Sequence, residues 1–200
     1  MRNLIYIILI AFSITSCGGG KTDLDKHSYV SWVQNPENGL VKEKQIGDYG
    51  LEVQYRPLEL IALTENNEIQ LEEMKSRCNE LSDSQYFNFK LKSNDPLLKV
   101  MDIGNVDEQD YYAKLEYFTN GIQQDLKLID GNDTLICMFS VFERTYDLAP
   151  YVTFALAFEN QSQNAGDKTL YFDGSKLGLG PVYLKIESNE IKNTPNLILG

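Results

Sequence analysis

The stretch LEVQYR, residues 51–56, alternates strictly between apolar and polar side chains. This period of two predicts a β-strand with one face buried and the other in water. A second stretch, QYFNFKLK at residues 85–92, alternates in the same way and places Phe87, Phe89 and Leu91 on one face. Strands with a single apolar face need a second layer to cover it, so these two stretches indicate a layered fold.

Two segments with helical periodicity can supply that layer. The first covers residues 67–81, with Asn67 as its predicted N-cap. The second begins at Asp107, and we expect Asn120-Gly121 to close it in a left-handed conformation. The apolar stripes of the two helices consist of Leu71, Met74, Cys78 and Leu81, and of Tyr111, Leu115, Phe118 and Ile122.

Further strands follow from apolar runs bounded by turn residues. Residues 130–133 (DGND) predict a hairpin turn, which we favour over a calcium loop because the spacing of ligands is incomplete. The run LICMFSVF, residues 135–142, is apolar on both faces and predicts a central, doubly covered strand. Pro57 suits the start of a short helix at 58–63. The remaining predicted strands are residues 29–34, 41–46, 122–129, 134–145, 152–159, 168–173 and 182–187.

The resulting prediction is an α+β fold. A largely antiparallel sheet of about 8 strands carries two longer helices on one face, and a β-sandwich with helical insertions is the alternative. A hydrophobic content of 42% is enough for a core. We expect a single globular domain over residues 28–200.

The N-terminal residues 1–17, MRNLIYIILIAFSITSC, have the composition of a secretory signal, and the apolar run is too short to span a bilayer. They end in Ile14-Thr15-Ser16-Cys17, which resembles the lipobox of bacterial lipoproteins. The resemblance covers residues 1–17 alone. It implies that residues 1–16 are a cleaved signal peptide, that Cys17 receives a diacylglyceryl thioether, and that its new amine is acylated, commonly with palmitate. An ordinary secretory signal with an incidental cysteine is the alternative.

Residues 17–27 are predicted to form a lipidated flexible tether, because three glycines follow Cys17 and polar residues continue to His27. We expect the protein in the cell envelope, at the outer membrane. Asp23 and Asp25 resemble the acids near the cysteine of surface-exported lipoproteins of the Bacteroidetes type, so periplasmic and surface-facing placements both stay open.

The formal net charge of −11 argues against nucleic acid as a partner and against a protein held on anionic lipid by its own surface. The partners we expect are the lipid bilayer, through acylated Cys17, and another envelope protein.

The sequence shows no catalytic motif. His27 is the only histidine, and the chain lacks G-x-S-x-G, H-E-x-x-H and paired C-x-x-C patterns, so we predict no catalytic residue, metal site or cofactor. The glycine-rich residues 174–181 do not fit a phosphate loop. For Cys78 and Cys137 a disulfide and two buried free thiols both stay open.

These observations favour a membrane-anchored lipoprotein that acts as a non-catalytic accessory or binding subunit. Two alternatives are a glycan-active enzyme that uses two carboxylates and a surface lipoprotein that binds carbohydrate through exposed, coplanar aromatic rings.

Overall fold

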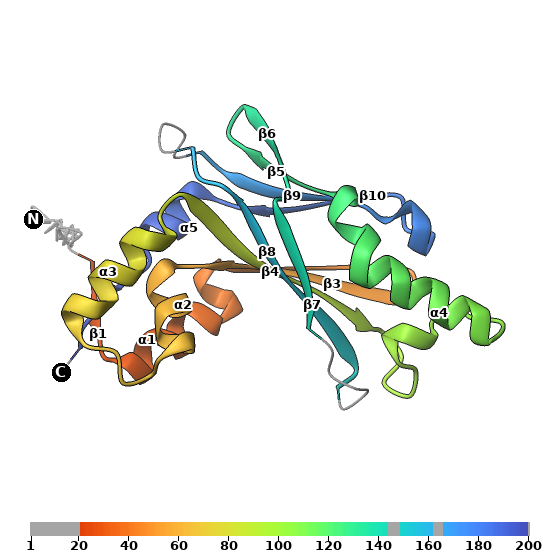
Figure 1. Cartoon of the computed structure of the whole chain (residues 1–200), viewed down its shortest axis with the longest axis horizontal. Helices are drawn as coiled ribbons and strands as arrows, with labels where there is room; N and C mark the ends of the chain where they lie inside the picture. Colours follow the sequence, from red (N-terminus) through yellow and green to blue (C-terminus); the bar gives the residue numbers. More distant parts are fainter. Residues whose placement is uncertain (1–20, 144–148, 162–165, 200) are drawn as a thin grey trace, which may run out of the picture.

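A computed structural model describes residues 21–143, 149–161 and 166–199 (Figure 1). The predicted signal peptide, Cys17 and residues 18–20 lie outside the described residues. So do residues 144–145 at the end of one predicted strand, and residues 162–165 of a polar loop.

A five-stranded antiparallel sheet forms around the two alternating stretches. Leu51 and Val53 pair with Leu91 and Phe89 and bury the same face, while Glu52 on the other face accepts a hydrogen bond from Lys90 Nζ at 2.8 Å. The strand order is β2 (Val41–Ile46), β3 (Tyr49–Arg56), β4 (Ser84–Ser93), β8 (Tyr151–Glu159) and β7 (Phe139–Glu143).

A four-stranded antiparallel sheet faces the first across the core. The ring centroids of Phe89 in β4 and Phe172 in β9 are 5.1 Å apart, which joins the two layers. The order in this sheet is β10 (Pro181–Ile186), β9 (Lys168–Asp173), β5 (Leu126–Asp130) and β6 (Asp133–Ile136).

The helices gather at the two ends of this layered body (Figure 1). One end carries α1 (Lys26–Gln34), α2 (Leu58–Glu65), α3 (Leu71–Leu81) and α5 (Ser188–Lys192). The other end carries α4 (Glu108–Glu116), which continues through the π-turn η3 (Tyr117–Gly121) into η4 (Ile122–Asp125). The remaining short turns are η1 (Pro36–Asn38), η2 (Val100–Asp102) and η5 (Gly174–Leu177).

The predicted α+β class is confirmed, with largely antiparallel strands and longer helices against them. The strands divide between two facing sheets, a feature of the sandwich alternative. The side chains of Phe118 in η3 and Phe154 in β8 are both fully buried, with ring centroids 5.3 Å apart, so the α4 end packs on the five-stranded sheet.

The strand predicted at residues 29–34 is wrong, because this segment is helix α1. Asp25 caps it by accepting a hydrogen bond from Ser28 N–H at 2.9 Å, and the buried Tyr29 and Val33 lie one helical turn apart. His27 therefore sits in the first turn of a helix, with its side chain exposed, rather than in a linker.

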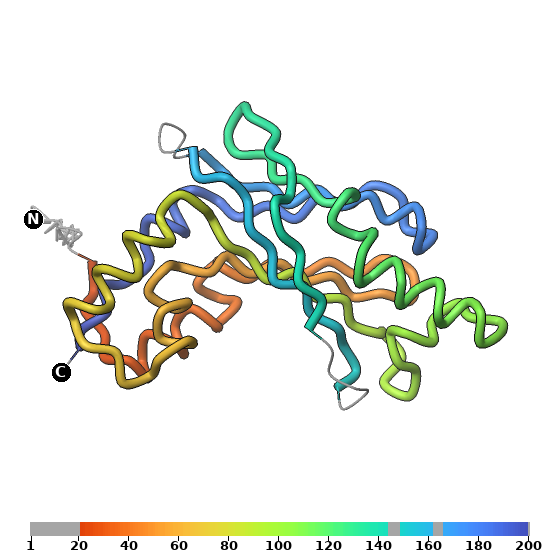
Figure 2. Tube along the Cα trace, in the orientation of Figure 1, coloured from red at the N-terminus to blue at the C-terminus, as the bar shows by residue number. Residues whose placement is uncertain are grey.

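The described chain is already ordered at the residues predicted to end the tether. Strand β1 (Asp23–Leu24) pairs in parallel with β11 (Asn196–Leu197), so the folded part starts before residue 28. Figure 2 shows that the two ends of the described chain consequently lie together, at the end of the molecule that holds α1, α2 and α3.

The single central strand predicted at residues 135–142 is also wrong. The run breaks at Cys137-Met138 into β6 and β7, which are edge strands of different sheets. Burial alternates along both strands, and Ile136, Phe139 and Val141 are at the exposed positions.

Two of the predicted helix ends differ from the structure. The N-cap of α3 is Gln70 rather than Asn67. Gly121 has a φ of −103°, so the chain continues through a further helical turn where we expected a left-handed stop. The N-cap at Asp107 and the hairpin turn at residues 130–133 are confirmed, the latter with Gly131 at a φ of +60°.

Candidate functional site

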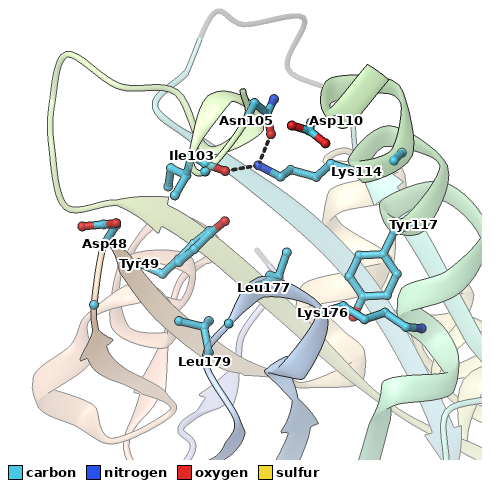
Figure 3. A pocket seen from close by; sticks show the side chains of 14 residues that line it. Asp48, Tyr49, Ile103, Asn105, Asp110, Lys114, Tyr117, Lys176, Leu177 and Leu179 are labelled. Atoms are coloured by element: carbon cyan, nitrogen blue, oxygen red, sulfur yellow. Dashed lines mark hydrogen bonds between the residues drawn. The ribbon is translucent and has the colours of Figure 1, made fainter. Parts of the chain in front are cut away.

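A pocket of about 560 Å³ is lined in part by α4 (Figure 3). Figure 1 shows α4 at the end of the molecule opposite the chain ends. Four segments that are distant in the sequence form the pocket. They are the β2–β3 turn at residues 47–49, the loop at 103–105, one side of α4 and η3, and the loop at 176–179. Loops that converge at one end of a rigid scaffold are a common location for binding sites.

The turns that reach the pocket depend on glycine. Gly47 and Gly104 have φ values of +57° and +73°, a left-handed conformation that other residues adopt only with strain. Gly47 allows β2 to reverse into β3 and thereby brings Asp48 and Tyr49 to the rim. Burial, with the nearby charge of Asp48, raises the pKa of Tyr49 to about 12, so its phenol is neutral at physiological pH.

Lys114 of α4 lies in the wall of the pocket and holds the neighbouring loop (Figure 3). Its ammonium donates to the backbone oxygen of Ile103, to the backbone oxygen of Met101 at 3.2 Å and to Asn105 Oδ1 at 2.8 Å. Burial lowers the pKa of Lys114, while the carboxylates of Asp102 and Asp110 oppose that shift. Because an ammonium has three donors, Lys114 is committed to positioning the loop and has no donor left for a ligand.

A second set of charges is balanced where η3 meets the loop at residues 176–179. Tyr117 Oη donates to Asp125 Oδ2 at 2.8 Å, and Lys176 Nζ lies 3.1 Å from the same oxygen. Lys176 Nζ also lies 4.7 Å from the centroid of the Tyr117 ring, a cation–π contact. Burial, followed by the hydrogen bond and charge of Asp125, raises the pKa of Tyr117 well above its ordinary value.

The pocket has polar groups but no nucleophile with an adjacent base. Asp48 and Asp110 stand on different sides of it (Figure 3), and Asp110 Oδ2 already accepts a hydrogen bond from Val106 N–H at 2.8 Å. Within the described ranges, no group of three or more His, Cys, Asp or Glu is placed to hold a metal ion.

The two cysteines considered for a disulfide are free thiols with different neighbours. Cys78 Sγ lies 3.8 Å from Met74 Sδ in α3, whereas Cys137 Sγ lies 3.0 Å from the backbone oxygen of Phe139. Burial raises the pKa of Cys137 to about 12, which keeps its thiol protonated and unreactive. Cys17, the predicted lipidation residue, lies outside the described part of the chain.

Exposed aromatic rings do not form a flat platform in the pairs that the structure describes. Tyr171 and Tyr183 are tilted by 55°, and Tyr111 and Tyr112 meet at 86°. Sequence reasoning did not identify the pocket, because its residues come from separate turns and from the flank of one helix.

Comparison with known proteins adds no relative. No family model, no curated protein and no solved structure matches the chain.

Across the described residues, the helices are all too short or too polar to cross a membrane. The function must therefore be argued from the residues themselves.

Proposed function

We propose that this protein is a lipid-anchored, non-catalytic binding subunit of a bacterial cell envelope, held at the outer membrane by acyl chains on Cys17. The observation that carries the proposal is the tetrad Ile14-Thr15-Ser16-Cys17, followed closely by a folded body. Asp23, six residues after Cys17, is already paired with Asn196. Six residues span at most about 20 Å, so the anchor holds the body near the bilayer.

The position of the chain ends indicates which end of the folded domain would face the membrane. The described chain begins at the end formed by α1, α2 and α3, whereas α4, which lines the pocket, lies at the other end (Figure 1). In an anchored molecule, the end with α1, α2 and α3 would therefore face the bilayer, and the pocket would face away from the membrane.

Exposed apolar side chains on two edge strands support a protein partner. Ile136 in β6 is 74% exposed, and Phe139 and Val141 in β7 are 67% and 58% exposed. Edge strands can pair with a strand of another chain, and exposed apolar side chains add affinity to such pairing. These three residues are the surface at which we place an envelope protein.

The anchor is tested by mass spectrometry of the mature N-terminal peptide. We expect Cys17 to carry a diacylglyceryl group and an acylated amine, and we expect labelled palmitate to enter the wild-type protein but not the Cys17→Ser variant. Cys78→Ser is the matched control and should label as the wild type does, since that thiol is half-buried in α3. A wild-type peptide with a bare Cys17 thiol would overturn the proposal.

The partner surface is tested by affinity purification from detergent extracts. We expect the wild type to recover a stoichiometric envelope protein, and Phe139→Lys to reduce that recovery by about tenfold or more, because lysine on an edge strand opposes pairing. Leu97→Lys is the control, since Leu97 is 94% exposed and belongs to the connection between β4 and η2 rather than to an edge strand. Equal recovery by the wild type and both variants would exclude this surface.

Recognition of a small glycan is a second candidate function, favoured by one observation. Tyr49 and Tyr117 line the same pocket as Asp48, Asn105 and Asp110 (Figure 3), a combination of rings and oxygen acceptors that suits a sugar. Titration of the purified protein with cell-wall and storage oligosaccharides tests it, and saturable binding that Asp48→Ala abolishes would support it, since Asp48 is exposed at the rim of the pocket.

A further inference from the structure

A second hollow, of about 450 Å³, lies at the end where the chain ends meet. It runs between α2 and α3 on one side and residues 191–199 on the other. We call it the terminal groove. Its lining is mainly apolar and includes Tyr55, Leu58, Leu71, Met74, Leu197 and Leu199.

The apolar lining of the terminal groove is open to its surroundings. Leu71 is 50% exposed, and Leu197 and Leu199 are only partly buried. The charged residues of the groove are Lys21, Glu59 and Lys75, and Lys75 is paired with Glu72 at 2.8 Å. An open groove with more apolar than polar surface has room for a hydrocarbon chain.

The described chain begins at this groove, a few residues after Cys17 in the sequence. Lys21, the first described residue, lines the groove. Its position follows from the terminal strand pair, in which Asn196 N–H donates to Thr22 O at 2.9 Å and Ile198 N–H to Leu24 O at 2.8 Å. Cys17 is four residues before Lys21, so its Cα lies within about 14 Å of that of Lys21. A lipid on the sulfur of Cys17 is therefore within reach of the groove.

We propose that the terminal groove binds one acyl chain of the lipid carried by Cys17 of the same molecule. This inference rests on the lipidation proposed above. Burying hydrocarbon against the exposed parts of Leu71, Leu197 and Leu199 removes apolar surface from water on both partners, while the other chains remain in the bilayer. Two chains in the bilayer are enough for stable anchoring. Occupancy of the groove would fix the α1–α3 end against the membrane, so that the pocket at the other end keeps one orientation.

The experiment uses the full-length lipoprotein in membranes. Cells are supplied with a palmitate analogue that carries a diazirine near the end of its chain, the membranes are irradiated, and the peptides of the purified protein are analysed by mass spectrometry. We expect acyl cross-links within the same chain at residues 71–78 and 191–199, which form the two sides of the groove.

The matched variants are Leu71→Glu and Leu97→Glu. A carboxylate at residue 71 places a charge in the groove, and it should reduce the cross-links to residues 191–199 by about tenfold or more. It leaves the helix intact, because acidic residues are favourable in a first turn. Leu97→Glu changes an exposed leucine outside the groove and should leave the cross-links unchanged.

Two failures can be told apart in the same sample. An unmodified Cys17 overturns both the lipid anchor and the groove proposal. An acylated Cys17 whose diazirine reacts with bilayer lipid alone, or equally in wild type and Leu71→Glu, overturns the groove proposal and leaves the lipid anchor standing.

Discussion

Replacing Asp130 with alanine should lower the free energy of unfolding by about 3–5 kcal/mol. Asp130 is fully buried at the end of β5. Its Oδ2 atom accepts hydrogen bonds from Lys168 Nζ at 2.5 Å and from Gln85 Nε2 at 3.0 Å. Lys168 is 9% exposed, so the Asp130→Ala variant would leave an ammonium out of water without its counter-charge. Urea unfolding of the purified variant, followed by circular dichroism, measures the change.

The hydrogen bond from Gln85 makes Asp130 a link between the two sheets. Gln85 belongs to β4 of the five-stranded sheet, whereas Asp130 and Lys168 are cross-strand neighbours in the four-stranded sheet. The double variant Asp130→Leu with Lys168→Met should be more stable than either single variant, because no charge then remains buried without a partner.

An exposed ion pair is the control for this prediction. Lys75 and Glu72 are 2.8 Å apart, with side chains 60% and 85% exposed, and Glu72→Ala should change the stability by no more than about 0.5 kcal/mol. If Asp130→Ala cost as little as Glu72→Ala, the buried pair would not be needed to hold the two sheets together.

The parts of the fold that the sequence predicts are those fixed by local chemistry. The strands predicted at residues 51–56 and 85–92 are confirmed, because each strand has one buried face and the two strands pair with each other. The helix start predicted at Asp107 is confirmed, because the Asp107 carboxylate accepts hydrogen bonds from the N–H groups of Gln109 and Asp110.

The failures occur where tertiary contacts decide between two local options. Residues 29–34 have apolar side chains at spacings that suit either a strand or a helical turn, and the burial of Tyr29 and Val33 on one side selects the helix. Residues 135–142 contain no turn signal, yet the chain leaves one sheet for the other at Cys137-Met138. An apolar run alone does not reveal such a change of sheet.

The pocket and the terminal groove were equally beyond sequence reasoning. Each is assembled from segments separated by tens of residues, such as the 47–49 turn and the 176–179 loop of the pocket. Lys114 has no signature in the sequence beyond its place on α4, because its role depends on the carbonyl groups of a loop that packs beside it. Cys17 could be proposed as a lipidation residue for the opposite reason, since the lipobox that residues 14–17 resemble is a short contiguous motif.

Phe154→Ala should lower the free energy of unfolding by about 3–5 kcal/mol, because the truncation opens a cavity where three rings meet. Phe154 is fully buried in β8, and its ring centroid lies 6.1 Å from that of Phe89, 5.3 Å from that of Phe118 and 5.4 Å from that of Phe142. These rings come from β4, η3 and β7, so Phe154 joins the α4 end of the molecule to the five-stranded sheet.

The effect of Phe154→Ala should reach the pocket, because η3 follows α4 directly and Tyr117 is the first residue of η3. Hydrogen exchange should therefore quicken in residues 108–125 more than in α3, which packs at the other end. Phe139→Ala is the matched control: Phe139 is 67% exposed in β7, and its truncation should cost no more than about 0.5 kcal/mol. Equal losses of stability for the two variants would mean that the ring cluster does not hold the α4 end on the sheet, and that the pocket wall is positioned by the Lys114 hydrogen bonds alone.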